Sequence, residues 1–366
     1  MKKTILFLLL AAVMPVAEAQ QLSRFRPNEA TRLELDRPVG RTVKAEPGKA
    51  DPEPDYVLYR DIIRRYSWIE GKGDPISQEV ADHLPCYFRL SLKNSKGHWQ
   101  HIQAMHGDSL TQNHGKGTYI LDPGWDTSDE NREWREKLLR ICQWYLTSDL
   151  SGEQVAEERA YDKYGYMIYG FQPIRNGGNR VVASYINDYG YPVDITDTGE
   201  YTYGNVVMIT YDSHGYDSII DYLDGAGLRR LNNGVDRQQY VYDEKGRVLR
   251  SSSNNAVGDY MINDWCICGN IYEYDDAGNS YTITRVDHEM RPMRMPDWGI
   301  GRLETYIRCR VQLDRWGRKR EVVFLDAEGN PDTTLDGIHR VVYEYSDKGV
   351  LLSETCYDLD NAPMIF

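Results

Sequence analysis

From about residue 151 to the end of the chain, hydrophobic and polar residues alternate in short runs. In Tyr272-Glu273-Tyr274, for example, alternation places both rings on one face of an extended strand. Tyrosine supplies many of these apolar positions, and glycine interrupts the runs at short intervals. Short alternating runs bounded by turn residues are typical of antiparallel strands joined as hairpins. We therefore predict that this part of the chain is mainly β.

The runs end in a recurring turn, Asp-x-x-Gly. An aspartate at the first position accepts hydrogen bonds from backbone N–H groups two residues on, and a glycine at the fourth position adopts a left-handed conformation at little cost. Both features favour a type I turn with a following bulge, which reverses a strand. We interpret the following pairs as structural turns: Asp212 and Gly215, Asp243 and Gly246, Asp275 and Gly278, Asp314 and Gly317, and Asp326 and Gly329.

The turns recur with a period. Asp314 and Asp326 are 12 residues apart, and the related turn at Ser346 follows after a further 20, which gives a unit of about 32 residues. One unit carries an insertion near residues 290–300. A single hairpin is barely stable alone, so successive units must stack. After Pro363 only three residues remain, and we expect an open strand edge at the end of the array.

Two of these units resemble a known family. Residues 240–247 (YVYDEKGR) and 272–279 (YEYDDAGN) are similar to the YD repeat of Rhs-type and related surface proteins, and the resemblance covers about residues 160–366. The alternating spacing of 12 and 20 departs from that family and is more typical of β-hairpin repeat proteins secreted by gut Bacteroidetes. The resemblance implies stacked antiparallel hairpins in a curled sheet or β-roll. It also implies a shell, spacer or binding surface rather than a reaction.

The N-terminal part has a different texture. Residues 1–19 have a basic start, an apolar stretch and small residues before a cleavage point, which predicts a secretory signal peptide. Residues 20–55 read as a flexible leader, and residues 56–150 as a mixed α/β region. Helical spacing of apolar residues predicts helices over 56–70 and about 128–146. The repeat array then occupies residues 151–366.

Composition limits the partners. The formal net charge of −13 argues against nucleic acid and anionic lipid as partners, and no segment after the signal peptide is apolar enough to cross a membrane. The six cysteines are scattered along the chain, and we interpret them as buried thiols or as one or two incidental disulfide bridges.

A group of histidines is the strongest candidate for chemistry. Neutral imidazoles together with a carboxylate can hold zinc or a similar metal. The candidate ligands are His98, His101, His106, Asp108 and His114. The alternative is a polar loop with solvated histidines, since the sequence has no histidine pair at helical spacing with a glutamate base between them.

Aromatic residues are the second candidate. Tryptophan and tyrosine rings on a curved sheet can stack on the apolar faces of sugars. The candidates for ligand binding are Trp265, Trp298 and Trp316, and the alternative is that such rings pack against the next repeat.

Together these patterns predict an exported protein, periplasmic or extracellular, that acts as a non-catalytic binding or scaffolding surface for a protein or a glycan. We expect no cofactor. The alternative is a secreted enzyme with an unfamiliar, metal-dependent site around residues 98–114.

Overall fold

The computed structural model describes residues 56–112, 140–187, 189–191, 206–224, 226–229, 235–263, 266–296 and 302–365. The signal peptide and leader predicted for residues 1–55 lie outside the described residues.

Eighteen strands form one antiparallel sheet, and two more form a separate hairpin. In the sheet each strand pairs with the next along the chain, except that β1 pairs with β4 and β5 pairs with both β6 and β7. The strands of the sheet are β1 (Tyr56–Tyr59), β4 (Tyr87–Lys93), β5 (Trp99–His106), β6 (Ser109–Leu110), β7 (Ile141–Ser148), β8 (Val155–Asp162), β9 (Met167–Gly177), β10 (Arg180–Ile186), β11 (Val206–Tyr211), β12 (Asp217–Leu223), β13 (Arg237–Tyr242), β14 (Val248–Asn254), β15 (Gly269–Asp275), β16 (Ser280–Val286), β17 (Arg308–Leu313), β18 (Lys319–Leu325), β19 (Arg340–Tyr345) and β20 (Leu351–Tyr357).

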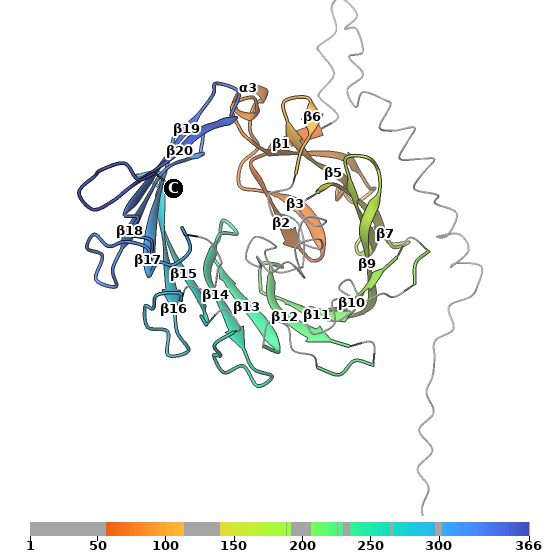
Figure 1. Ribbon diagram of the computed structural model, residues 1–366. Coiled ribbons are helices and arrows are strands. Elements are labelled where there is room, and N and C mark those ends of the chain that lie inside the picture. Colours follow the sequence, from red (N-terminus) through yellow and green to blue (C-terminus); the bar gives the residue numbers. More distant parts are fainter. Residues whose placement is uncertain are drawn as a thin grey trace, which may run out of the picture.

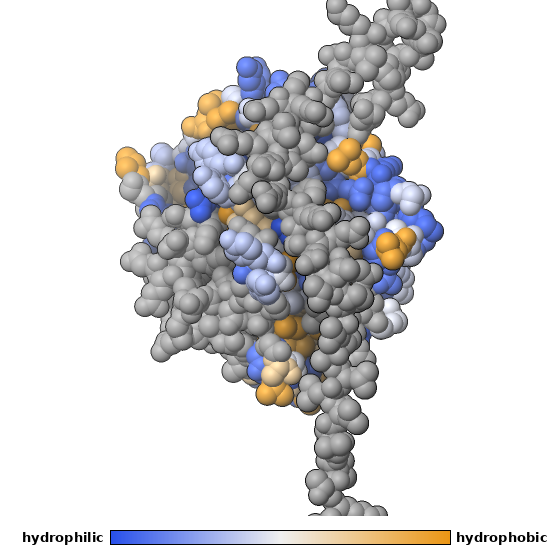
Figure 2. All heavy atoms as spheres, turned by 90° about the vertical axis from the view of Figure 1, so that its right-hand side faces the viewer, coloured by the Kyte–Doolittle hydropathy of each residue, from blue (hydrophilic) through white to orange (hydrophobic). Residues whose placement is uncertain are grey.

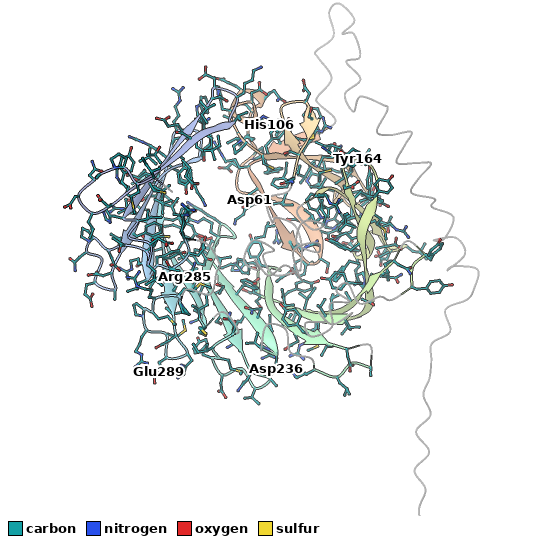
Figure 3. All side chains as sticks on the ribbon, viewed as in Figure 1. Asp61, His106, Tyr164, Asp236, Arg285 and Glu289 are labelled. Atoms are coloured by element: carbon teal, nitrogen blue, oxygen red, sulfur yellow. The ribbon has the colours of Figure 1, made fainter. Side chains whose placement is uncertain are left out.

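The sheet curls into an open ring (Figure 1). Its two end strands, β1 and β20, approach each other beside the short helix α3 (Gln78–Ala81), but their edges are not paired. The separate hairpin, β2 (Asp61–Arg65) and β3 (Trp68–Lys72), lies within the ring, with Asp61 near the centre of the view in Figure 3. The prediction of a mainly β fold of stacked antiparallel hairpins is confirmed.

The predicted helices are wrong wherever the structure describes them. Residues 56–70 form β1, β2 and the start of β3, and residues 141–146 belong to β7. Apolar residues three or four apart suggested a helix, but in β2 the buried residues are Ile62 and Arg64, two apart. Pairing with neighbouring strands outweighs the weak local preference for a helix. Residues 128–139 of the second predicted helix lie outside the described residues.

The hairpins give the ring two rows of turns. Because neighbouring strands are antiparallel, successive turns lie at opposite ends of the strands. The N-terminal segment, residues 56–84, packs on one of these rows, and we call its turns the covered turns. They are the turns at 94–97, 149–152, 212–215, 243–246, 314–317 and 346–349. We call the turns at 162–165, 187–190, 224–227, 255–258, 287–290, 326–329 and 358–361 the opposite turns.

The β2–β3 hairpin contacts the covered turns at its tip. The backbone N–H of Tyr66 donates to the carbonyl of Gly215 at 2.8 Å, and Arg65 Nε donates to the carbonyl of His214 at 2.6 Å. The ring of Trp68 stacks on His98, beside the turn at 94–97, with centroids 4.5 Å apart.

The rest of the N-terminal segment continues along the same row. Arg60 donates to the carbonyl of Trp316, and the His83 ring stacks on the Trp316 ring with centroids 4.0 Å apart. Arg318 Nη1 donates to the carbonyl of His83 at 3.1 Å, which ties the turn at 314–317 to the chain after α3. The N-terminal segment therefore covers one end of the ring.

A buried ion pair fixes the hairpin to the wall of the ring. Arg64 Nη1 and Nη2 each donate to one carboxylate oxygen of Glu158 on β8, both at 2.7 Å, and Tyr169 donates to the same carboxylate at 2.8 Å. The side chain of Glu158 is fully buried and that of Arg64 nearly so. Tyr169 is held in the neutral form, because burial raises its pKa well above the ordinary range.

One turn departs from the expected geometry. Gly215, Gly246, Gly317 and Gly329 all have positive φ values, but Gly278 does not, and its neighbour Asn279 takes φ +50° instead. The hairpin of β15 and β16 pairs through Asp275 and Ser280 without the bulge that interrupts the β11–β12, β13–β14, β17–β18 and β19–β20 hairpins, so the left-handed residue falls one position later.

All six cysteines are free thiols, so no disulfide contributes to the fold. Burial raises the pKa of Cys142 to about 12 and that of Cys309 to about 11. These two side chains therefore act as small apolar groups.

Candidate functional site

The opposite turn between β8 and β9 presents two tyrosines. The Asp162 side chain accepts hydrogen bonds from the backbone N–H groups of Tyr164 and Tyr166, each at 2.9 Å. The backbone N–H of Gly165 donates to the carbonyl of Asp162 at 3.1 Å, and Gly165 has φ +84°. The Asp-x-x-Gly frame thus fixes the backbone on both sides of Gly165 and directs both rings outward.

The next opposite turn, between β10 and β11, repeats this arrangement. The Asn187 side chain accepts from the backbone N–H groups of Tyr189 and Tyr191, each at 3.0 Å. Here asparagine provides the side-chain oxygen that aspartate provides in the other turn. Two equivalent turns therefore carry tyrosine at the same two positions.

We call these two turns the tyrosine turns, after the tyrosines that they carry: Tyr164, Tyr166, Tyr189 and Tyr191. These four tyrosines are between 68% and 80% exposed, whereas most large apolar residues of the neighbouring strands are buried. Because β8, β9, β10 and β11 are consecutive in the sheet, the two turns lie two strand spacings apart, roughly 10 Å. Figure 3 shows Tyr164 at the rim of the ring.

The character of the opposite turns changes around the ring. On the two turns that follow, Leu228 and Val257 are exposed. In the opposite turns at 287–290, 326–329 and 358–361, the position equivalent to Tyr164 is acidic and exposed. The residues there are Glu289, Glu328 and Asp360. One part of this end of the ring thus carries exposed aromatic rings, with Lys163 Nζ 5.0 Å from the centre of the Tyr164 ring, and the other part is acidic.

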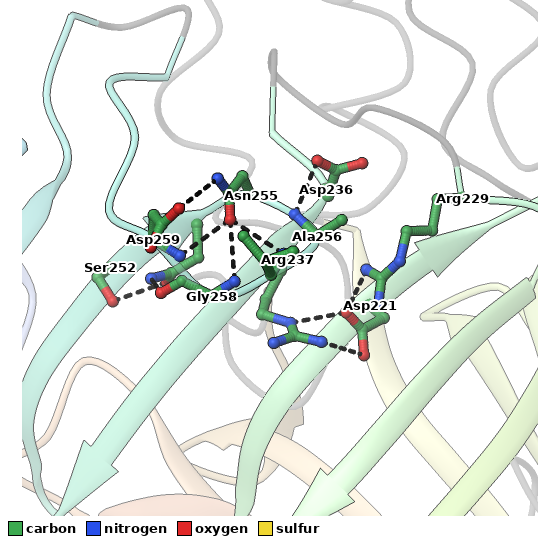
Figure 4. A network of polar contacts seen from close by, with 11 residues as sticks. Asp221, Arg229, Asp236, Arg237, Ser252, Asn255, Ala256, Gly258 and Asp259 are labelled. Atoms are coloured by element: carbon green, nitrogen blue, oxygen red, sulfur yellow. Dashed lines mark hydrogen bonds and ion pairs between the residues drawn. The ribbon is translucent and has the colours of Figure 1, made fainter.

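Polar contacts hold neighbouring opposite turns in place. Asp221 on β12 is buried and accepts from Arg237 Nε at 2.7 Å and from Arg229 Nη1 at 2.8 Å (Figure 4). The turn at 255–258 is joined to the residue that precedes β13, because the backbone N–H of Ala256 donates to Asp236 at 3.1 Å. These ties between successive units make the row of turns a fixed frame.

The surface on the side of β7, β9 and β10 is mixed. Figure 2 shows apolar residues there as small separate patches among hydrophilic ones. Scattered apolar residues of this kind are ordinary on a protein surface.

The predicted metal ligands that lie in the described part of the chain are not brought together. His98 and His106 lie near opposite ends of β5, and eight residues of extended strand separate them by about 26 Å. His101 is buried between Ser91 and Gln143 and stacks on Tyr145, with ring centroids 4.3 Å apart. Burial lowers the pKa of His101 to about 4, so this ring is neutral at pH 7.

The other candidate ligands lie apart from it. His106 Nδ1 lies 3.1 Å from the carbonyl oxygen of Leu84, and Asp108 is exposed on the turn that follows β5. His114 lies outside the described residues. In the described part of the chain, no group of three or more histidine, cysteine, aspartate or glutamate side chains could hold a metal ion.

Of the three tryptophans predicted to stack on sugars, the structure describes Trp316. Trp316 packs on the N-terminal segment, with its ring on His83. The partner of this ring is therefore the N-terminal segment and not the next repeat, which the packing alternative named. Trp265 and Trp298 lie outside the described residues.

A small pocket lies at the tip of the β2–β3 hairpin. Its volume is about 290 Å³, and its lining includes Tyr66, Ser67, Val155, Gly178 and Tyr211. Tyr66 and Ser67 form the turn of the hairpin with φ values of 50° and 66°, a left-handed pair that costs non-glycine residues about 1–2 kcal/mol each. The hydroxyls of Ser67 and Tyr211 bond to each other, and the Tyr66 and Tyr211 rings meet edge to face at 5.3 Å. These contacts hold the tip in place, so the pocket is part of the packing contact between the hairpin and the wall of the ring.

Sequence reasoning does not identify the tyrosine turns as a site. The signal that could have found them is the identity of the residues at the third and fifth turn positions, tyrosine in two successive copies.

The described residues include no helix that is long and apolar enough to cross a membrane.

Comparisons with known proteins give only distant likenesses. No family model matches the sequence, and no curated protein does. Among solved structures, the chain is similar to the crystal structure of TcdB2-TccC3-Cdc42, at 14% identity and a TM-score of 0.24. That match covers 77% of this chain and 12% of the other. A second likeness, to a eukaryotic initiation factor, has 10% identity and a TM-score of 0.23 and covers 85% of this chain and 95% of the other. Likenesses at this level leave the function to be argued from the geometry.

Proposed function

We propose that the protein is an exported, non-catalytic binding protein whose tyrosine turns bind a neutral glycan chain. The observation that carries the proposal is the pair of equivalent turns that hold four exposed tyrosines on a fixed frame. Tyrosine rings lose little conformational freedom on binding, and each offers an apolar face with a polar hydroxyl. Sugar rings offer the complementary combination of apolar faces and hydroxyls.

The spacing of the turns suits a linear chain. Two aromatic platforms roughly 10 Å apart can contact two sugar units of one chain, since this distance is comparable to the length of a disaccharide. Contacts at two points of one chain strengthen binding beyond either contact alone.

Charge favours a neutral ligand. Exposed acidic residues occupy the equivalent positions of the later turns, and the whole chain has a formal charge of −13. An anionic glycan would be repelled by this field, whereas a neutral one would not.

Binding to a panel of neutral polysaccharides, such as glucans, mannans, xylans and galactans, tests the proposal by affinity electrophoresis and calorimetry. We expect Tyr164→Ala and Tyr189→Ala each to weaken binding about tenfold. The stacking of a nucleic-acid base on an aromatic side chain is worth about 1–3 kcal/mol, and we take the lower part of this range for a sugar face. Tyr164→Phe should retain most of the affinity, since the ring remains.

The matched control is Glu328→Ala, a change at the same position of a later turn, which should bind as the unchanged protein does. A panel with no binder would refute the glycan ligand. Binding that survives both alanine changes would show that the site lies elsewhere.

A further inference from the structure

The outer edge of β20 is the place where the ring's repeat pattern stops. In each earlier unit, the second strand uses three to five residues of its outer edge to pair with the first strand of the next unit. These residues are 219–221 of β12, 250–252 of β14, 280–284 of β16 and 321–323 of β18. The residues of β20 that correspond to 321–323 are Ser353, Glu354 and Thr355, 32 positions later.

The remainder of this edge is occupied as in the earlier units. Tyr357 forms a bridge with Pro363, and the backbone N–H of Met364 donates to the carbonyl of Cys356 at 2.9 Å. In β18, Leu325 and Pro331 form the same bridge. Pro363 and Met364 therefore occupy part of this edge as Pro331 and Asp332 do in β18, and among the described residues the open part of the edge is residues 353–355.

The backbone groups of Glu354 point outward from this edge. Cys356 directs its carbonyl to Met364 on the outer side, and backbone groups two residues apart in a strand point the same way. At the other end of the sheet, the edge of β1 is partly covered, because the backbone N–H of Ile76 donates to the carbonyl of Leu58 at 2.9 Å.

Glu354 departs from the repeat on the face that points to the core. It lies opposite Tyr343 and on the same face as buried Cys356. The earlier units carry Ile220, Ser251, Ile283 and Val322 at this position. Ile220 and Val322 are buried by the next unit, whereas Glu354 is exposed.

Apolar residues surround this charge. Val350, Leu351 and Leu352 precede it, and all three are exposed, with Leu352 at 66%. An edge strand with exposed apolar residues and unpaired backbone groups is prone to pair with another chain, and an inward-facing charge is a known safeguard against it.

We propose that Glu354 keeps the β20 edge from pairing with a second copy of this chain. Two copies that meet antiparallel through the open residues place Glu354 directly opposite Glu354, with Ser353 opposite Thr355. Like charges directly opposite each other on adjacent strands are destabilising. With an aliphatic residue in place of Glu354, the same pairing joins two sheets across a two-fold axis.

Analytical ultracentrifugation of the full chain and its variants tests the proposal. We expect Glu354→Val to form dimers with a dissociation constant at least tenfold below that of the unchanged chain. Glu354→Pro also removes the charge but removes the outward N–H as well, and it should remain monomeric. Glu344→Val is the matched control: the Glu344 carboxylate lies on the other face of the sheet, where it accepts a hydrogen bond from Ser353 at 2.9 Å. This change removes a charge but leaves Glu354 in place, and the variant should also remain monomeric.

If the Glu354→Val variant folds poorly, a mixing experiment with Glu354→Lys still tests the proposal. Glu354→Lys alone should be monomeric, and mixed with the unchanged chain it should form heterodimers, because lysine then faces glutamate. A monomeric Glu354→Val variant together with a mixture that does not associate would overturn the proposal. So would an unchanged chain that already dimerises through β20, or a Glu344→Val variant that associates as strongly as Glu354→Val.

Discussion

The same substitution of glycine should lower the free energy of unfolding more in a covered turn than in an opposite turn. Gly349 in a covered turn and Gly329 in an opposite turn both have left-handed backbones, with φ values of +76° and +92°. Gly349 is buried and Gly329 is exposed. Alanine at either position costs about 1–2 kcal/mol for the backbone conformation alone.

At Gly349 a second cost is added. A Cβ there would lie 2.6 Å from the carbonyl oxygen of His83 and 2.6 Å from the carbonyl carbon of Leu84, both backbone atoms. At Gly329 the nearest atom is Arg308 Nη1 at 3.7 Å, the far end of a flexible side chain. Forcing an extra methyl into a packed contact costs about 1–3 kcal/mol. We therefore expect Gly349→Ala to cost about 2–5 kcal/mol and Gly329→Ala about 1–2 kcal/mol.

Urea unfolding followed by circular dichroism measures both free energies of unfolding. The midpoints should differ while the slopes stay alike, since neither change alters the surface exposed on unfolding. Equal costs for the two variants would refute the close packing of the N-terminal segment on the covered turns. The chain already carries Met290 and Asn361 with positive φ at the fourth position of opposite turns, which agrees with the lower cost there.

Three further predictions concern buried groups. Glu158→Gln should cost about 3–5 kcal/mol in the free energy of unfolding, because it leaves the Arg64 charge buried without its partner, whereas the double change Arg64→Met/Glu158→Leu should cost less; an equal or larger cost for the double variant would contradict this. His101 has a folded-state pKa of about 4, below its ordinary 6.5, so its contribution to stability is lost as the pH falls from 6.5 to 4. Between pH 7.5 and pH 5, His101→Gln should lose about 2 kcal/mol less in the free energy of unfolding than the unchanged chain does, and equal losses would contradict a buried neutral ring. Titration with Ellman's reagent should find six thiols after unfolding without reductant, with the four buried ones unreactive in the native protein; fewer than six would indicate a disulfide.

The local parts of the candidate site could be predicted from the sequence. The Asp-x-x-Gly turn forms through hydrogen bonds between residues no more than four apart, such as Asp162 to Tyr164 and Tyr166, so its sequence is sufficient to specify it. The exposure of the tyrosines could not be predicted, because alternation places a tyrosine on a face without saying what covers that face. The separation of His98, His101 and His106 could not be predicted for a related reason: spacing along the chain did not reveal that β5 is extended and holds them apart.

The sequence by itself determined the strands of the repeat region, their turns and their period, because each depends on neighbours within a few residues. Only the tertiary structure decided that residues 56–70 are strands, since their partners are distant: Arg64 meets Glu158, 94 residues away, and Tyr66 meets Gly215. It also decided which turns are covered and which are exposed. Identical local hydrogen bonds form both rows, and the difference arises from the long-range packing of the N-terminal segment on one end of the ring.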